Sequence, residues 1–258
     1  MTRMALTLLA AGLCLGCFFI VTNGTARPAA KRQEATGAPG TMRVLMIGDS
    51  LSTGAFGEAV QQHLARRFGP QNVAAYASCG SSPEHWLQGE PAFYTKCGYR
   101  ESTPDRLPVL RDWVNGKPPR ATLTPKLEAL VKRHQPTVVL VQLGTNWMDR
   151  DLSDAEINSI LNRFVAATRG GSVRQIIWIA PPDSSSLGAR AQARVHRLIQ
   201  QSGKRDNFEV IDSRQLTHYV PGKTGGDGIH YNKEALRAWA VRINSSLDAR
   251  LRGKMANR

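Results

Sequence analysis

Five short apolar runs alternate along this chain with five longer segments of helical spacing, and no other feature constrains its fold as strongly. The apolar runs cover residues 43–47, 72–77, 137–143, 174–180 and 208–211. The helical segments cover residues 57–68, 124–134, 154–168, 189–201 and 233–251. Such alternation predicts an α/β fold, with a mostly parallel sheet of five strands covered by helices on both faces.

The N-terminal 26 residues have the composition of an export signal or a membrane anchor. Arg3 precedes an uncharged stretch over residues 4–21, and the next charged residue is Arg27. An apolar stretch with a basic start, followed by small residues, is typical of a segment that directs export. Three forms stay open: a signal cleaved near residue 26, an uncleaved anchor, and a lipoprotein modified at Cys17. In each form we expect a periplasmic, extracellular or envelope-anchored protein.

The rest of the chain divides into a linker and one domain. Residues 27–41 are rich in Ala, Gly, Pro, Thr and basic residues without an apolar period, which predicts a flexible linker. The chain of 258 residues has no internal repeat, and residues 42–258 are enough for one substantial core. Residues 81–122 are rich in Pro, Gly and aromatic residues and too long for an ordinary connection, so we expect an insertion over the functional site.

The formal net charge of +14 and the isoelectric point near 10.2 predict attraction to polyanions. Acidic cell-surface polymers, anionic lipid headgroups and nucleic acid all have the required charge, and composition does not choose among them. Export argues against nucleic acid. We therefore expect no nucleic-acid partner, and the charge favours an anionic polymer of the cell envelope.

The four cysteines fall into two pairs. Cys14 and Cys17 lie in the predicted leader, which leaves Cys79 and Cys97 as the only two in the domain. In an oxidising compartment this pair is expected to form a disulfide, and two buried free thiols are the alternative.

Candidate catalytic residues follow the first strand and precede the last helix. The sequence GDSL at residues 48–51 comes directly after the apolar run at 44–47, so Ser50 lies where open α/β sheets carry their functional sites. Far downstream, Asp227 and His230 have the spacing Asp-x-x-His. A nucleophilic serine needs an imidazole as base and a carboxylate to orient it. The alternatives are a helix cap for Ser50 and a turn residue for Asp227.

Three strand ends place hydrogen-bond donors at the same edge of the sheet. Ser50 follows the first strand, Gly80 the second and Asn146 the third. When an ester is attacked, its carbonyl oxygen becomes an anion, and donors aimed at that oxygen usually make the largest catalytic contribution. The backbone N–H groups of Ser50 and Gly80 and the amide of Asn146 are therefore a candidate oxyanion hole, and glycine at position 80 allows a close backbone approach.

Together these residues resemble the four signature blocks of the SGNH or GDSL hydrolases, which are named for Ser, Gly, Asn and His. The blocks here are residues 48–51, Gly80, 144–146 and 227–230, and the resemblance spans roughly residues 43–240. It implies a three-layer α/β/α sandwich of flavodoxin-like topology. The implied roles are nucleophile for Ser50, base for His230, partner of that base for Asp227, and oxyanion donors for Gly80 and Asn146.

Trp147 departs from the family pattern, in which Asp often follows the Asn of the third block. The departure bears on the acyl pocket, so Trp147 is a candidate substrate contact, together with His85 and Trp86 of the insertion. Aromatic faces suit sugar rings and acyl chains equally well. A small core within the insertion is the alternative explanation for these aromatic residues.

No metal or cofactor is implied. The His, Cys, Asp and Glu residues have no spacing typical of metal ligands, and no Cys-x-x-Cys sequence lies outside the leader. A serine esterase needs neither a metal nor a cofactor, and we expect none.

The sequence thus predicts an exported serine esterase that works through a Ser-His-Asp triad and an acyl-enzyme. Envelope location, positive charge and the aromatic insertion favour an O-acetyl group on a cell-envelope glycan as substrate. A lipase or lysophospholipase is the nearest alternative, an O-acyltransferase would use the same residues, and a non-catalytic envelope-binding protein would keep only the scaffold. The acyl length, the alcohol and the oligomeric state do not follow from the sequence.

Overall fold

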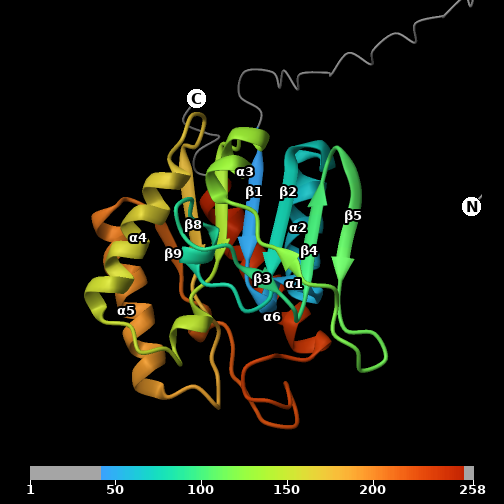
Figure 1. Ribbon diagram of the computed structural model, residues 1–258, viewed down its shortest axis with the longest axis vertical. Coiled ribbons are helices and arrows are strands. Elements are labelled where there is room, and N and C mark those ends of the chain that lie inside the picture. The colour runs from blue at the N-terminus through green and yellow to red at the C-terminus, as the bar shows by residue number, and fades with distance from the viewer. Residues whose placement is uncertain (1–41, 253–258) are drawn as a thin grey trace, which may run out of the picture. The chain divides into compact units, whose positions relative to one another are not determined.

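A seven-stranded sheet forms the centre of the protein, in a computed structural model that describes residues 42–252 (Figure 1). The strand order is β5-β4-β2-β1-β7-β8-β9. All five predicted strands are present, and they pair in parallel. These strands are β1 (Val44–Gly48), β2 (Val73–Ser78), β7 (Val138–Gln142), β8 (Gln175–Ile179) and β9 (Glu209–Ile211).

The predicted number of five strands is wrong, because the insertion adds a hairpin to the same sheet. β4 (Tyr99–Thr103) pairs antiparallel with β2, and β5 (Arg106–Arg111) pairs antiparallel with β4. β5 is an edge strand with mostly exposed side chains, so it lacks the apolar pattern by which a buried strand is recognised. A separate two-stranded sheet joins β3 (Tyr94–Thr95) to β6 (Thr122–Leu123).

Helices cover both faces of the sheet, which gives the expected three layers (Figure 1). α2 (Ala55–Phe68) and α6 (Lys233–Arg252) lie on one face. α3 (Leu127–His134), α4 (Asp154–Thr168) and α5 (Ala189–Arg205) lie on the other. Shorter helical turns are α1 (Ser50–Thr53), η1 (Pro70–Asn72), η2 (Pro83–Trp86), η3 (Thr145–Trp147) and η4 (Ser213–Gln215).

Alternate side chains of β1 enter the two different cores. Leu45 and Ile47 pack with α3, α4 and α5, whereas Val44 and Met46 pack with α2 and α6. Burial of such a side chain contributes about 1.5–3 kcal/mol relative to leaving it in water. A strand that is apolar on both sides is therefore held firmly in the middle layer, and the residues that directly follow it have a fixed position.

A disulfide between Cys79 and Cys97, as predicted for this pair, ties the end of β2 to the start of the hairpin. The two Cα atoms are 5.6 Å apart, and closing a loop of this length contributes roughly 3 kcal/mol. The Cys79 N–H also donates to the Gly98 carbonyl oxygen at 2.9 Å. Both links hold the turn after β2, where Gly80 lies.

The predicted leader (residues 1–26) and linker (residues 27–41) lie outside the described residues, as do residues 253–258. Among the helices of residues 42–252, none is both long and apolar enough to cross a membrane.

Candidate active site

Ser50 is the first residue of α1, directly after the turn that ends β1. Asp49 caps this short helix, since its Oδ1 atom accepts a hydrogen bond from Leu51 N at 3.0 Å. Gln142 of β7 holds the same turn: its carbonyl oxygen accepts from Asp49 N, and its Oε1 atom accepts from Ser52 Oγ at 2.6 Å. The turn therefore places Ser50 at the carboxyl edge of the sheet, with an N–H group that a helix does not use internally.

Asp49 is completely buried beneath this turn. Burial raises the pKa of its carboxyl group to about 6, and the hydrogen bond from Leu51 only partly opposes this. The side chains of Gln142 and Thr145 also lower this pKa, although Oδ2 is buried without a well-aligned hydrogen bond within residues 42–252. Asp49 thus fixes the turn and does not reach substrate.

Three side chains from distant parts of the chain meet at this edge. His230 Nε2 lies 3.0 Å from Ser50 Oγ, although the two residues are 180 positions apart. His230 Nδ1 lies 2.6 Å from Asp227 Oδ2. An ionised carboxylate can only accept, so Nδ1 carries the proton and Nε2 presents its lone pair to the serine hydroxyl. The arrangement can remove a proton from Ser50 as it attacks.

The charge of Asp227 is well stabilised. Partial burial by itself would raise the pKa of Asp227, but hydrogen bonds from the His230 ring and from the backbone N–H groups of Ile229 and His230 outweigh it and lower the pKa to about 2. The two backbone bonds to Oδ1 are 2.9 and 2.7 Å long. Asp227 is consequently ionised at any pH near neutrality and favours a protonated Nδ1.

Tyr219 clamps the loop that carries Asp227 and His230. Its hydroxyl accepts a hydrogen bond from Gly228 N at 2.9 Å and donates to the His230 carbonyl oxygen at 3.3 Å. Ser184 Oγ donates to the Gly228 carbonyl oxygen at 2.6 Å. The sequence analysis did not identify Tyr219 or Ser184, because a hydrogen bond between loops has no periodicity or motif by which it can be predicted.

Only glycine can occupy position 228 in this loop. Its φ of +86° lies in the left-handed region, and a Cβ atom there would come within 2.5 Å of Ser186 Cβ. The close approach lets the loop pack directly against residues 184–186, which donate hydrogen bonds to the Gly228 carbonyl oxygen.

The predicted oxyanion donors follow three adjacent strands of the sheet, β2, β1 and β7. Asn146 Nδ2 donates to the Ser81 carbonyl oxygen at 2.9 Å, which ties η3 to the turn that holds Gly80 and leaves a second amide hydrogen to donate. Gly80 has a φ of +77°. Within residues 42–252 the N–H groups of Gly80 and Ser50 make no hydrogen bond. Three N–H donors are therefore available at this edge of the sheet.

The structure contradicts the prediction that Trp86 and Trp147 contact substrate. Their side chains are 0% and 1% exposed, because both belong to the core beneath α4. Trp86 Nε1 donates to Ser81 Oγ at 3.1 Å, and Trp147 Nε1 donates to Glu84 Oε2 at 3.0 Å. They support the turns that carry Gly80 and Asn146 from below, so their effect on a bound ester is indirect.

His85 remains a candidate contact. It is half-buried, and its ring stacks on Phe93 with centroids 4.0 Å apart. Its Nδ1 atom accepts from Ser82 N at 2.9 Å, and burial lowers its pKa. Phe93 also comes near Gly80, since a Cβ atom at Gly80 would lie 3.6 Å from Phe93 Cζ. The stacked pair therefore borders the turn that presents the Gly80 N–H.

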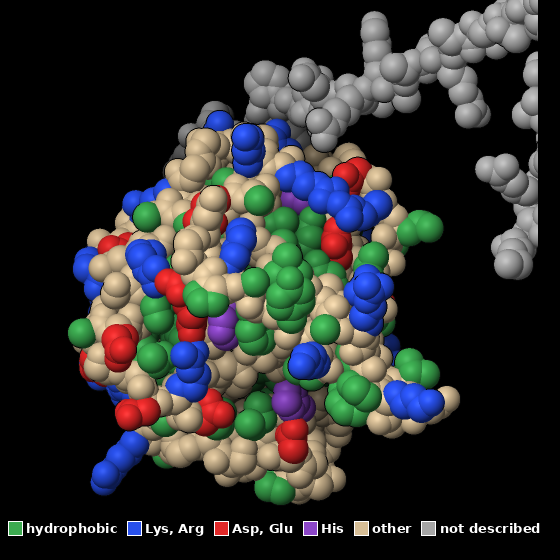
Figure 2. Space-filling model, viewed as in Figure 1, with side chains coloured by type: hydrophobic (Ala, Val, Ile, Leu, Met, Phe, Trp, Pro, Cys, Tyr) green, Lys and Arg blue, Asp and Glu red, His purple; other side chains and the backbone are tan. Residues whose placement is uncertain are grey.

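The site is open to solvent. The side chains of His230 and Asp227 are 50% and 54% exposed. Figure 2 shows that Lys and Arg side chains are spread over the visible face and interspersed with acidic ones, rather than gathered in one stripe. Among residues 42–252, no three His, Cys, Asp or Glu side chains are grouped in a way that would hold a metal ion. Water and a large substrate can both reach the serine.

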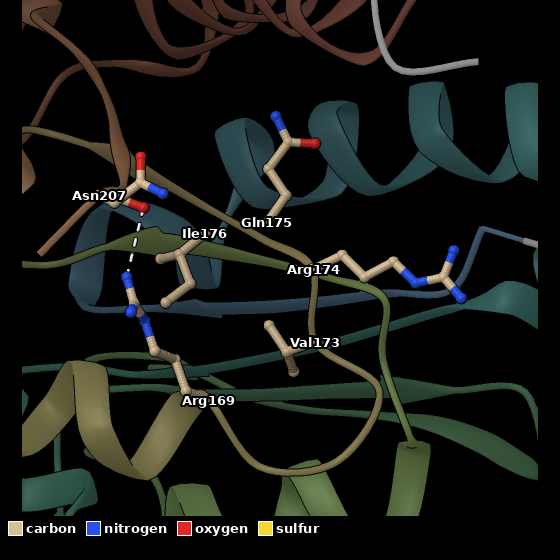
Figure 3. Close-up of a pocket in the computed structure, with 6 residues that line it drawn as sticks. All are labelled: Arg169, Val173, Arg174, Gln175, Ile176 and Asn207. Atoms are coloured by element: carbon tan, nitrogen blue, oxygen red, sulfur yellow. Dashed lines mark hydrogen bonds between the residues drawn. The ribbon is translucent and has the colours of Figure 1, made fainter. Parts of the chain in front are cut away.

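A hollow of about 280 Å³ lies away from the candidate active site, at the amino ends of the parallel strands, where β8 begins (Figure 3). Arg169 donates to the carbonyl oxygens of Asp206 and Asn207, whereas Arg174 extends away from the other lining residues. The remaining lining residues are Val173, Gln175 and Ile176. No nucleophile or base is among them.

Comparisons with known proteins agree with this geometry. Residues 44–243 match the model of a family described as GDSL-like lipase/acylhydrolase. A search of curated protein sequences gives no match.

Several solved structures share the fold. A lipase/acylhydrolase from Enterococcus faecalis is 18% identical, with 81% of this chain and 97% of that chain covered and a TM-score of 0.52. Est24, a carbohydrate acetylesterase from Sinorhizobium meliloti, is 14% identical, with 81% and 99% covered and a TM-score of 0.56. A peptidoglycan O-acetylesterase is 13% identical, with 83% and 92% covered and a TM-score of 0.53.

Proposed function

Since the chain belongs to the GDSL-like lipase/acylhydrolase family and is an ester-hydrolysing enzyme, we propose that it is an exported serine esterase that removes O-acetyl groups from a cell-envelope glycan. The family match confirms the resemblance to the SGNH or GDSL hydrolases. The observation that carries the proposal is the 3.0 Å contact between His230 Nε2 and Ser50 Oγ, with Asp227 already in place behind the ring.

Ser50 is the proposed nucleophile. Its Oγ atom forms a bond to the ester carbonyl carbon while His230 Nε2 takes the hydroxyl proton. The carbonyl oxygen becomes an oxyanion, which the N–H groups of Ser50 and Gly80 and the amide of Asn146 would stabilise. As the tetrahedral intermediate collapses, the bond to the alcohol oxygen breaks and His230 returns its proton to that oxygen. The alcohol leaves, and the acyl group stays on Ser50.

Water completes the cycle. His230 removes a proton from a water molecule, the hydroxide oxygen bonds to the acyl carbon, and the bond to Ser50 Oγ breaks as the serine regains its proton. Asp227 stabilises the imidazolium in both halves of the reaction and stays ionised throughout. The solvent exposure of the His230 ring suits this second step, because water needs no channel to reach it.

Two observations support an acetylated glycan as substrate. The triad is half exposed, so a short acyl group on a bulky polymer can reach Ser50 without being enclosed. The net charge of +14 suits an anionic envelope polymer. Solved structures of the same fold include a peptidoglycan O-acetylesterase and a carbohydrate acetylesterase. The names of both enzymes describe removal of acetyl groups from a carbohydrate, as proposed here.

Export is part of the proposal, and two observations support it: the composition of residues 1–26 and the disulfide. An uncharged apolar stretch after Arg3 is what a signal peptide or an anchor requires. The disulfide between Cys79 and Cys97 agrees with an oxidising compartment.

The test is release of acid from competing substrates by the purified protein. Acetylated glycan and lysophospholipid are incubated side by side, and mass spectrometry measures free acetate, free fatty acid and any acetyl group transferred to a second glycan. The proposal predicts free acetate as the main product, abolished by Ser50→Ala. Fatty acid as the main product would make the protein a lysophospholipase, and transferred acetyl groups would make it an acyltransferase.

A further inference from the structure

A groove of about 300 Å³ lies beside the candidate active site, and neither the family match nor the triad accounts for it. It opens between four elements: the end of α1, the start of α2, the β4–β5 hairpin and the start of α6. The residues that matter are Thr53 of α1, Arg100 and Leu110 of the hairpin, and Lys233 and Leu236 of α6. The insertion that extends the sheet thus forms one wall of this groove.

The groove begins close to the reacting atoms. Gly48, two residues before Ser50, pairs with Ala77 of β2, Ala77 pairs with Arg100, and Arg100 pairs with Leu110. Two strand spacings of about 4.8 Å therefore separate β1 from Arg100. From the other side, Thr53 Oγ1 donates to the Ser50 carbonyl oxygen at 2.8 Å.

The groove is also linked to the His230 loop through the chain, because its lining residue Lys233 follows His230 by three positions. In ester hydrolysis the imidazole gives its proton to the departing alcohol, so the alcohol must lie on the side of His230. Gly80 and Asn146, the donors for the carbonyl oxygen, come from turns that do not line the groove. Its position therefore matches the alcohol side of the ester better than the acyl side.

Arg100 has an unusual environment for a half-buried guanidinium. Its one side-chain hydrogen bond within residues 42–252 runs from Nη2 to the neutral Gln61 Oε1 at 2.8 Å. Its Nε atom is buried without a partner, and no carboxylate of these residues lies within ion-pair distance. Burial lowers the pKa of Arg100, and the charge of Glu58 in the same groove opposes this shift without forming an ion pair with the guanidinium.

The other charges of the groove leave it positive. Lys233 is exposed and makes no ion pair within the part of the chain that the structure describes. Glu58 is the one acidic lining residue, and Gln62 Nε2 donates to it at 3.2 Å. Leu110 and Leu236 add apolar surface. Two cations and one carboxylate beside two leucines suit a ring with an apolar face and an attached anion.

We propose that this groove binds the alcohol side of the ester, and that the alcohol is a sugar that carries a carboxylate, held by Arg100 and Lys233. The inference rests on the proposed esterase function and narrows its substrate to an O-acetylated acidic glycan. A carboxylate gives Arg100 the direct ion pair that it lacks within residues 42–252, and the sugar ring packs against Leu110.

The experiment compares one acetylated glycan in two forms with the purified domain. An O-acetylated galacturonate oligomer is used with its carboxylates free and with its carboxylates converted to primary amides, and acetate release gives kcat/KM for each. We expect kcat/KM to be about tenfold or more higher for the free carboxylates, since a charge-assisted hydrogen bond is lost in the amide. Arg100→Gln should abolish this preference and leave kcat/KM for the amide within about twofold.

Matched variants separate this role from a structural one. Arg111→Gln changes an arginine of the same hairpin that donates to Thr122 Oγ1 outside the groove, and it should keep the preference. Lys233→Gln should reduce the preference, and it tests the groove independently if Arg100→Gln fails to fold. Thermal melting of each variant monitors folding.

The outcomes also separate this inference from the proposed function. Hydrolysis of 4-nitrophenyl acetate, which has no carboxylate, tests the esterase alone and should be equal in wild type and Arg100→Gln. If that ester is hydrolysed but the two glycan forms react equally, or neither reacts, the inference is overturned while the esterase stands. If 4-nitrophenyl acetate is not hydrolysed by the wild type, the proposed function itself is wrong.

Discussion

The two edges of the central sheet both carry an arginine-lined hollow, yet they differ in chemistry. At the amino edge, Arg169 bonds to backbone carbonyl oxygens after α5, and Arg174 is exposed to water (Figure 3). At the carboxyl edge, Arg100 is half-buried and donates to Gln61, and its groove is lined by Thr53 and Lys233, which follow Ser50 and His230 by three residues each.

The difference follows from the direction of parallel strands. At the carboxyl edge each strand runs into a turn or helix start whose N–H groups are free, as at Ser50 and Gly80. At the amino edge the chain arrives from helix ends, and carbonyl oxygens need donors, which Arg169 supplies. One edge is therefore suited to an oxyanion, and the other uses its arginine to complete the fold.

Removing an oxyanion donor should have the largest effect at the carboxyl edge. Asn146→Ala is expected to lower kcat about 10²–10³-fold with 4-nitrophenyl acetate, because the developing oxyanion loses one hydrogen bond. The control is Asn158→Ala on α4, whose amide donates to the Asp154 carbonyl oxygen far from Ser50. A loss below threefold for Asn146→Ala would remove this residue from the oxyanion hole.

The buried carboxyl group under Ser50 should make stability depend on pH. The pKa of Asp49 is about 6 in the folded protein and near its ordinary value of 3.8 in the unfolded chain. Between these values the folded state keeps a proton that the unfolded state has lost, so this contribution to stability is present below pH 4 and is lost as pH rises through 6.

The free energy of unfolding of wild type relative to Asp49→Asn should therefore fall by roughly 2–2.5 kcal/mol between pH 4 and pH 7. Urea unfolding of both proteins across this range measures the difference, and titrations common to both cancel. Parallel stability curves would mean that Asp49 is not perturbed by its burial.

Loss of the Tyr219 clamp on the His230 loop should have a smaller effect than loss of Asn146 or ionisation of Asp49. Tyr219→Phe removes the hydroxyl that holds Gly228 and the His230 carbonyl, and kcat is expected to fall by about tenfold with little change in KM, because the ring is less well placed. Tyr76→Phe is the control, since it removes a hydroxyl that bonds to His134 Nε2 away from the loop. Equal losses of activity in both variants would show that Tyr219 acts only through general stability.

The amino edge should show the smallest effect. Arg169→Gln removes hydrogen bonds to exposed carbonyl oxygens, so the free energy of unfolding should fall by about 0.5–1.5 kcal/mol and kcat/KM should stay within twofold. Chemical denaturation and the 4-nitrophenyl acetate assay measure the two quantities. A tenfold loss of activity in Arg169→Gln would contradict the account in which only the carboxyl edge takes part in catalysis.

The sequence predicted the features that depend on the periodicity of apolar residues and on the order of strands along the chain. The five buried strands have apolar runs, which predicted the sheet. Because the carboxyl ends of parallel strands meet at one edge, the order of the strands also predicted that Ser50, Gly80 and Asn146 lie at the same edge. The Asp227–His230 spacing predicted the pair, although its position against Ser50 depends on how the loop folds back over the sheet.

What failed depends on burial and on partners distant in sequence. β5 has exposed side chains and no apolar period, so the hairpin was not foreseen. Trp86 and Trp147 were predicted as candidate substrate contacts, but both indoles are buried in the core beside their 3₁₀ turns. The environment of Arg100 does not follow from the sequence, because Gln61 and Glu58 approach it from α2, about forty positions away in the chain.

The central claim is that Ser50 is the activated nucleophile of this edge, and covalent labelling tests it most directly. A fluorophosphonate should form one adduct, located by mass spectrometry on Ser50, and labelling should disappear in Ser50→Ala. The neighbouring Ser52, whose hydroxyl donates to Gln142, should stay unlabelled in both proteins. An adduct that persists in Ser50→Ala, on Ser52 or on any other residue, would contradict the account.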